Sequence, residues 1–159
     1  MSRLAIAGCV ALLLAACTTA PSPSAGGDPD ALTQVDRWIL QGASDAKGER
    51  IDVVFPGGTA LHAMSFDAGR VSLAGGCNRI FGSYGIDGEG RLVVDALAST
   101  RMACADASLM AADTAVSDLV QGTAELRIAE SWPEQLFLVH SDGRRSAWTA
   151  DRPRDTAGP

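Results

Sequence analysis

The sequence predicts an α+β protein that is mostly β, with a curled antiparallel sheet or an open β-barrel of about eight short strands and one packed α-helix. Three observations support this fold class. Short apolar segments recur with turn residues between them, one longer segment has helical periodicity, and strands do not alternate with crossover helices as they would in a parallel sheet.

Turn sequences define the strand pattern. Asp67-Ala68-Gly69 and Asp87-Gly88-Glu89-Gly90 each place a glycine where a hairpin needs a positive φ, and apolar segments flank both. Pro56-Gly57-Gly58 and Asp142-Gly143 separate further segments in the same way. The expected strands are 38–40, 51–55, 61–66, 70–74, 82–86, 91–94, 125–129, 136–140 and 146–149.

One segment has the spacing of a helix. Its single apolar stripe consists of Leu109, Ala112, Val116, Leu119 and Val120. Asp106 or Ser108 can cap the N-terminus, and Gly122 lies where a helix commonly ends in left-handed backbone. Because the stripe is narrow and the opposite face is polar, we expect this helix to pack across the sheet and not to enter a membrane.

The first residues form an export signal. Arg3 supplies a positive charge, residues 4–16 are apolar, and Leu14-Ala15-Ala16-Cys17 ends the segment. The run is shorter than the ~20 residues that a transmembrane helix needs. Since it ends on Cys17, it resembles the lipobox of bacterial lipoproteins. That resemblance implies a diacylglyceryl thioether on Cys17, cleavage after Ala16 and acylation of the new amine. Several acyl chains anchor a protein firmly, at about 0.8 kcal/mol per buried methylene.

The remaining chain divides into three parts. A lipidated cysteine and a flexible tether are expected at 17–31, since this stretch is small, polar or proline. A folded domain follows at 32–150, and a disordered tail at 151–159 has no large apolar side chain. Lipoproteins resembling the class retained in the inner membrane usually carry Asp after the lipidated cysteine, whereas Thr18 stands here. We therefore expect the inner leaflet of the outer membrane, with the domain facing the periplasm.

Composition limits the partners. The chain of 159 residues has a formal net charge of −6, and loss of Arg3 with the leader makes it more negative. This balance argues against a nucleic-acid partner and against electrostatic binding to anionic lipid headgroups. The lipid anchor on Cys17 should be the link to the membrane. At 47% hydrophobic and 20% charged residues, the chain can bury a core.

Cysteine usage agrees with export. Of the four cysteines, Cys9 leaves with the leader and Cys17 is lipidated, so Cys77 and Cys104 remain. In an oxidising periplasm two thiols predict a disulfide, and closing a loop of this size contributes roughly 3.5 kcal/mol. The alternative is two unpaired, buried cysteines that pack as small apolar side chains.

Two segments carry a family resemblance. Ala74-Gly75-Gly76-Cys77-Asn78-Arg79-Ile80-Phe81-Gly82-Ser83-Tyr84, together with Leu97-Ala98-Ser99-Thr100-Arg101-Met102-Ala103-Cys104, closely resembles the META domain family, the HslJ-like lipoproteins. The likeness covers roughly residues 35–149. It implies a small β-rich fold with one helix, similar to cracked-barrel envelope proteins, and a link to stress responses such as heat shock, but no defined reaction. The family-motif residues are Gly75, Gly76, Asn78, Arg79, Thr100, Arg101 and Met102.

Each motif residue has a structural and a functional interpretation. Gly75 and Gly76 allow the backbone to bend tightly, and Asn78 can bond nearby amides; the alternative is a ligand-binding loop. Arg79 and Arg101 come close to each other if the disulfide forms, which would permit a small anion site. More often such arginines cover apolar surface with their stems and bond loop carbonyls.

No catalytic, metal or cofactor motif is present. His62 and His140 do not belong to a short-spaced ligand set, and a disulfide removes the thiolate that a Cys–His nucleophile pair needs. We therefore expect no enzyme activity, no metal and no cofactor. Trp38 and Trp148 should be core residues, whereas Trp132 is a possible partner-binding anchor.

The sequence thus predicts a lipid-anchored periplasmic META-type protein with a non-catalytic binding or envelope-maintenance role in a stress response. Its partner would be an unknown envelope protein or a small apolar ligand. The alternative is a dedicated protein partner, as for a pilotin-like chaperone or an inhibitor of a cell-wall hydrolase.

Overall fold

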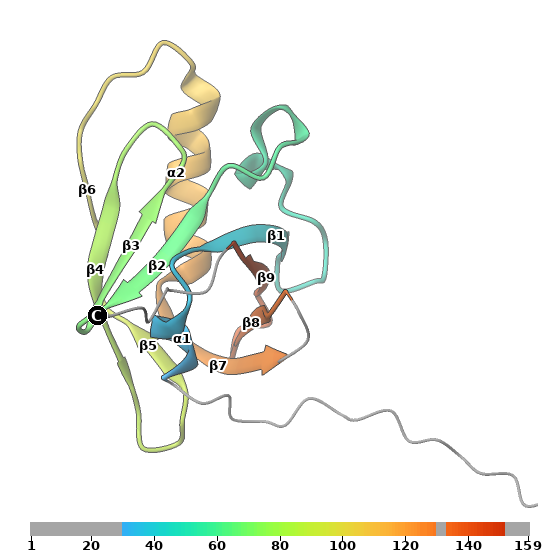
Figure 1. Cartoon of the computed structure of the whole chain (residues 1–159). Coiled ribbons are helices and arrows are strands. Elements are labelled where there is room, and N and C mark those ends of the chain that lie inside the picture. Colours follow the sequence, from blue (N-terminus) through green and yellow to red (C-terminus); the bar gives the residue numbers. More distant parts are fainter. Residues whose placement is uncertain (1–29, 130–132, 152–159) are drawn as a thin grey trace, which may run out of the picture.

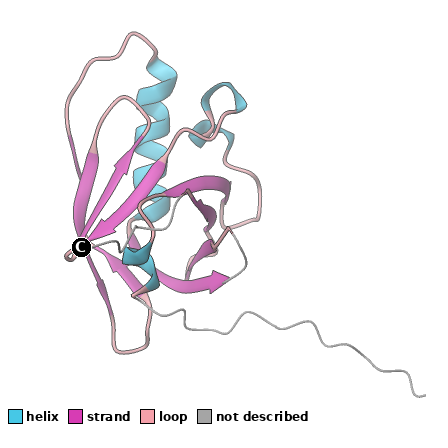
Figure 2. Cartoon of the chain, viewed as in Figure 1, coloured by secondary structure: helices cyan, strands magenta, loops and turns pink. Residues whose placement is uncertain are grey.

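Strand pairing closes the sheet into a barrel. The computed structural model describes residues 30–129 and 133–151, and within them the strands pair antiparallel in the order β3-β2-β1-β9-β8-β7-β5-β4-β6. A further pairing of β3 with β4 completes a ring of eight strands, and β6 joins β4 outside the ring (Figures 1 and 2). The strands are β1 (Trp38–Ser44), β2 (Ala63–Asp67), β3 (Arg70–Ala74), β4 (Ile80–Ile86), β5 (Leu92–Val94), β6 (Ala98–Ser99), β7 (Gly122–Ala129), β8 (Gln135–His140) and β9 (Arg145–Ala150). The predicted mostly β barrel is confirmed.

The predicted hairpins form where the turn residues indicated. Strands β2 and β3 pair from Asp67 with Arg70, and the two residues between them, Ala68 and Gly69, both have positive φ. Between β4 and β5, the Asp87 carboxylate accepts hydrogen bonds from the turn's backbone. These contacts explain why aspartate and glycine mark both turns.

Several strands differ from the sequence expectation: β4 begins at Ile80 and β7 at Gly122, earlier than the predicted 82 and 125, and β1 and β6 differ further. Strand β1 continues to Ser44, beyond the predicted end at 40, because a β-bulge between Leu40 and Gly42 breaks the alternation that the sequence pattern relies on. Strand β6 was not predicted, since two exposed residues carry no periodic signal.

The strand predicted at 51–55 is wrong. This segment forms a 3-10 helix, η1 (Asp52–Val54), which is followed by η2 (Pro56–Gly58). Val53 is exposed whereas Val54 and Phe55 are both buried, so the side chains do not alternate as in a strand. An isolated bridge between Ser44 and Arg50 lies just before the segment, and the Ile51 backbone N–H donates to the Ala43 carbonyl. The segment instead packs against the barrel's helix.

The predicted helix is α2 (Ala107–Val120), and it packs its apolar side against the core of the barrel. Asp106 is the N-cap: its carboxylate accepts a hydrogen bond of 2.8 Å from the Ser108 backbone N–H. In the view of Figure 1, helix α2 passes behind β2. The predicted stripe residues Ala112, Val116, Leu119 and Val120 are buried.

The two ends of the domain are tied together at the barrel. A short helix, α1 (Ala31–Gln34), was not predicted; its Leu32 is buried and accepts a hydrogen bond from Trp38 Nε1. Asp151, assigned to the tail from the sequence, forms an ion pair with Arg37. Trp38 and Trp148 are fully buried, as predicted.

We expect the protein to lose stability in mild acid because of His140. Burial lowers the pKa of His140 below its usual 6.5, and the nearby Arg144 adds to this effect. The unfolded chain then binds a proton more readily than the folded one, so stability should fall as the pH drops below about 6.5. Urea unfolding between pH 7.5 and 5 should show this loss. The slope should be smaller in His140→Asn, and equal slopes in both proteins would contradict the assignment.

The aspartates of two turns, Asp87 and Asp142, affect stability in a different pH range. Hydrogen bonds from Arg91 and from Arg144 lower the pKa values of Asp87 and Asp142, respectively, below 3.8. Their stabilising contribution is lost as the pH falls below that value. It therefore does not obscure the His140 effect.

Candidate functional site

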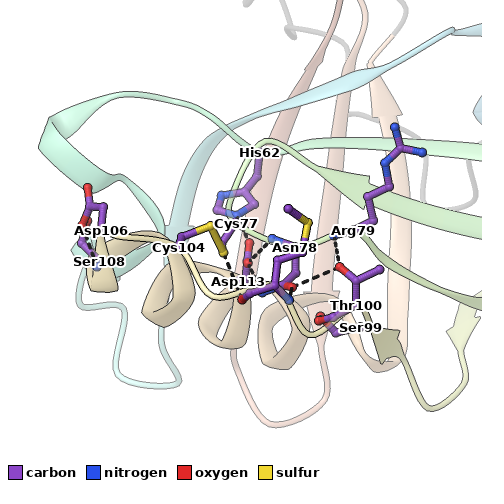
Figure 3. Close-up of a disulfide and its surroundings, with 11 residues drawn as sticks. His62, Cys77, Asn78, Arg79, Ser99, Thr100, Cys104, Asp106, Ser108 and Asp113 are labelled. Carbon is purple, nitrogen blue, oxygen red and sulfur yellow. Dashed lines mark hydrogen bonds and ion pairs between the residues drawn. A yellow bond between two sulfur atoms is a disulfide. The ribbon is translucent and has the colours of Figure 1, made fainter.

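The two family-motif segments meet at one corner of the barrel. Cys77 and Cys104 form a disulfide with Cα atoms 5.9 Å apart, which confirms the predicted bridge over the alternative of two free cysteines. The bridge joins the turn before β4 to the loop that leads into α2 (Figure 3). The disulfide therefore holds the turn before β4 (residues 75–79, which we call the motif turn) beside the loop after β6.

Close backbone approach explains the two motif glycines. Gly75 has a φ of +117°, and a Cβ there would lie 1.9 Å from the carbonyl oxygen of Leu61. A Cβ at Gly76 would lie 1.7 Å from Oδ1 of Asp113. No side chain fits at either position, so the structural interpretation of Gly75 and Gly76 is sufficient.

Asn78, in the motif turn, forms hydrogen bonds with the loop after β6 and with α2. Its Oδ1 accepts hydrogen bonds from Thr100 Oγ1 (3.0 Å) and from the Met102 backbone N–H (2.8 Å). Its own backbone N–H and Nδ2 donate to Asp113 Oδ2 on α2, at 2.7 and 3.2 Å. Asn78 thus links the loop after β6 to the helix (Figure 3).

A buried carboxylate lies behind this corner. Asp113 is 5% exposed, and its other oxygen, Oδ1, lies 3.4 Å from Nε2 of His62, which is fully buried. A carboxylate oxygen accepts hydrogen bonds, so Nε2 of His62 is the donor in this contact. Within the described residues Nδ1 has no hydrogen-bond partner.

Sequence reasoning missed the role of Asp113, although a signal was present. Asp113 lies four residues after Leu109 and three before Val116, on the apolar stripe itself. A carboxylate at such a position is buried and needs donors from elsewhere in the fold. His62 belongs to the segment 61–66 that was expected to be a strand; it lies just before β2 and is fully buried.

A groove lies between the loop after β6 and α2, and we name it the motif groove. It has a volume of about 370 Å³. Its lining residues are Asn78, Ser99, Thr100, Arg101, Met102, Met110, Asp113, Thr114, Ser117 and Asp118. Met102 and Met110, on opposite walls, are large apolar side chains with 61% and 41% exposure. Exposed apolar side chains gathered in a groove are typical of binding sites.

The two motif arginines do not converge. Arg101 lines the motif groove, whereas the side chain of Arg79 extends away from Thr100 and from α2 (Figure 3). The contacts between 79 and 100 are made by backbone groups and by the Thr100 hydroxyl. The side chains of Arg79 and Arg101 therefore do not form the anion site that the sequence permitted.

Two other depressions differ in character from the motif groove. One of about 530 Å³ lies between the β4–β5 turn and β7, where Arg91 is already paired with Asp87 and Glu89. The other, of about 260 Å³, lies over β1, β8 and β9. Neither contains a motif residue.

Some sequence expectations fall elsewhere. Trp132 and the lipidation site Cys17 lie outside the described residues. Among the residues that are described, no group of three His, Cys, Asp or Glu side chains is placed to hold a metal ion. Within the same ranges, no helix combines the length and hydropathy that a membrane crossing requires.

An antiparallel barrel with one helix packed against it, and a corner where a disulfide joins the two motif segments, defines the class of protein. The chain matches the META domain over residues 30–152, and it belongs to that family, as the motifs indicated. No curated protein matches it.

Two solved structures share the fold. An NMR structure of a protein from Burkholderia xenovorans is 23% identical with a TM-score of 0.64, and the match covers 89% of this chain and 100% of that one. A second NMR structure is 23% identical with a TM-score of 0.50, over 77% of this chain and 94% of that one. At this identity the likeness extends to the fold alone.

Removing the buried carboxylate tests the structural role of Asp113. Asp113→Ala leaves Asn78 and His62 without their buried acceptor and should lower the free energy of unfolding by about 3 kcal/mol. Asp113→Asn keeps one acceptor oxygen for Asn78 and should cost about half as much. Urea unfolding with the disulfide intact measures both. Asp118→Ala, at an exposed position on the same helix, is the control and should change stability by less than about 0.5 kcal/mol; equal effects at 113 and 118 would contradict this role.

Proposed function

We propose that this META-domain protein is a lipid-anchored envelope protein that acts by binding, without turnover, and that the motif groove is its binding site. The observation that carries the proposal is the pair of exposed methionines, Met102 and Met110, facing one groove whose walls are fastened to each other. Methionine side chains adapt to irregular apolar surfaces and are frequent at binding sites.

The walls of the groove are held before any ligand arrives. The strand-side wall is fixed by the disulfide and by Asn78, and Asn78 is bonded in turn to Asp113 on the helix-side wall. A preformed site loses little conformational freedom on binding, which favours affinity. The polar side chains of the corner thus position the groove, and the methionines supply contact area.

A binding role without turnover is supported by the chemistry of the corner. The two motif cysteines are bonded to each other, so neither supplies a thiolate. The one His–Asp pair of the corner, His62 with Asp113, has a fully buried histidine that a substrate would not reach.

The sequence supports an envelope location. The leader ends in a lipobox-like segment at Cys17, and the small, polar residues after it suit a tether with a reach on the order of 40 Å. Thr18 favours the outer membrane, and a disulfide is typical of an oxidising compartment. The family resemblance adds a role in envelope maintenance under stress.

The anchor is tested by replacing its sulfur. Cys17→Ser should abolish incorporation of a labelled fatty acid and move the protein out of the membrane fraction, because no thioether can form. Cys9→Ser, within the leader, is the matched control and should remain labelled. Fractionation of the two membranes shows which one holds the wild type. A labelled Cys17→Ser protein, or an unlabelled wild type, would rule out this anchor.

The binding site is tested by photo-crosslinking in the living envelope. A photo-reactive residue at Met110 should give discrete crosslinked products that mass spectrometry identifies. The same residue at Lys47, exposed on the turn after β1 and outside the groove, should not give those products. Identical product patterns from 110 and 47, or products from neither, would count against the motif groove as a binding site.

A further inference from the structure

We propose that the motif groove binds an extended peptide segment of another envelope protein, which adds to the free edge of β6 as an extra strand. This inference rests on the proposed function and specifies the partner. It is argued from the direction of backbone groups at β6, the position of α2 beside that edge, and the charge of Arg101.

The backbone of residues 97–102 alternates in direction. Thr100 N–H donates to the Arg79 carbonyl, and Met102 N–H donates to Asn78, so the even-numbered residues face β4 and the motif turn. The pairing of Ile80 with Ser99 follows the same register. In an extended chain the odd-numbered residues then point their N–H and C=O groups to the other side. In the described part of the sheet β6 is the last strand in the order, so no strand follows on that side.

The odd-numbered side faces the helix. The Leu97 backbone N–H donates to Oε1 of Gln121, the residue that ends α2, at 3.4 Å. Ser99 and Arg101 are the next two residues with the same orientation, and both line the motif groove. A peptide between β6 and α2 would accept their N–H groups as the Gln121 side chain accepts that of Leu97. Addition of a strand to a free sheet edge is a known mode of peptide recognition.

The groove suits an extended chain. One wall is residues 99–102, and the other is the side of α2 that runs from Met110 to Asp118. A strand added to β6 would lie about 4.8 Å from it and point alternate side chains to one face. Met102 and Met110 give an apolar contact for one of these side chains. A peptide can form hydrogen bonds with outward-pointing backbone groups beside exposed apolar side chains, whereas a purely apolar ligand cannot.

Charge narrows the partner further. Arg101 is exposed, and among the described residues it has no ion-pair partner. Asp118, the exposed acidic residue of the groove, lies on the helix wall. The segment should therefore carry a carboxylate near Arg101 and an apolar side chain toward Met102 and Met110.

The test uses the mature lipidated protein in nanodiscs and a displayed library of random peptides as the probe. We expect enrichment of peptides with apolar and acidic residues. Hydrogen exchange with a synthetic copy of an enriched peptide should slow at the amides of Ser99 and Arg101. Arg101→Pro removes one outward N–H and should weaken binding about tenfold, since that donor is lost and the edge is blocked. Arg101→Ala keeps the N–H and should weaken binding only about threefold.

A second substitution guards against misfolding. If Arg101→Pro fails to form the disulfide or to unfold cooperatively, Met110→Lys on the opposite wall takes its place. It places a charge in the apolar part of the groove and should also weaken binding about tenfold.

Several results would overturn the proposal. Equal affinity of wild type and Arg101→Pro, or exchange protection confined to other strands, would leave a binding protein without strand addition. Concentration-dependent dimers that Arg101→Pro abolishes would show that the edge pairs with a second copy instead. No enriched peptide, together with discrete crosslinks at 110 to a small apolar molecule, would refute the peptide and keep the binding role. No enrichment and no crosslink would refute both.

Discussion

The corner of the barrel depends on one buried carboxylate. Asp113 is almost fully buried and receives donors from the Asn78 backbone, the Asn78 amide and the His62 ring. A buried carboxylate is costly unless several hydrogen bonds stabilise it, so the motif turn must remain where it can donate. The spacing between the turn and α2 follows from this requirement, and so does the width of the motif groove.

The motif sequence is then explained by what must surround that carboxylate. Gly76 has no side chain because a Cβ would overlap Asp113 Oδ1, and Gly75 lacks one because Leu61 is equally close. The Asn78 side chain has an acceptor for the loop after β6 and, on a separate atom, a donor for Asp113, a combination that an ionised Asp side chain does not offer. These residues have a structural role. They position the exposed side chain of the nearby motif residue Met102.

Local signals predicted the local elements. The hairpin turns and the α2 stripe follow from residues near one another, and the disulfide was predicted from the number of cysteines together with the expected export. The segment 51–55 was misjudged because its burial is set by α2, which is more than fifty residues away in sequence. Asp113 and His62 are 51 residues apart in the sequence. The one sequence signal for their contact was the unusual presence of an aspartate on an apolar stripe. Strand β6 could not be predicted from the sequence because it is defined by its pairing with β4 and not by a pattern in its own residues.

The disulfide and the carboxylate hold the same corner by different means. The bridge acts mainly on the unfolded chain, where closing a loop of 27 residues removes conformational entropy. The hydrogen bonds of Asp113 act on the folded state, where they fix direction as well as distance. The bridge alone would leave the loop after β6 free to rotate about two cysteines. The orientation of residues 99–102, and hence of the free edge of β6, therefore depends on the pairing with β4 and on Asn78 and Asp113 as well as on the covalent bond.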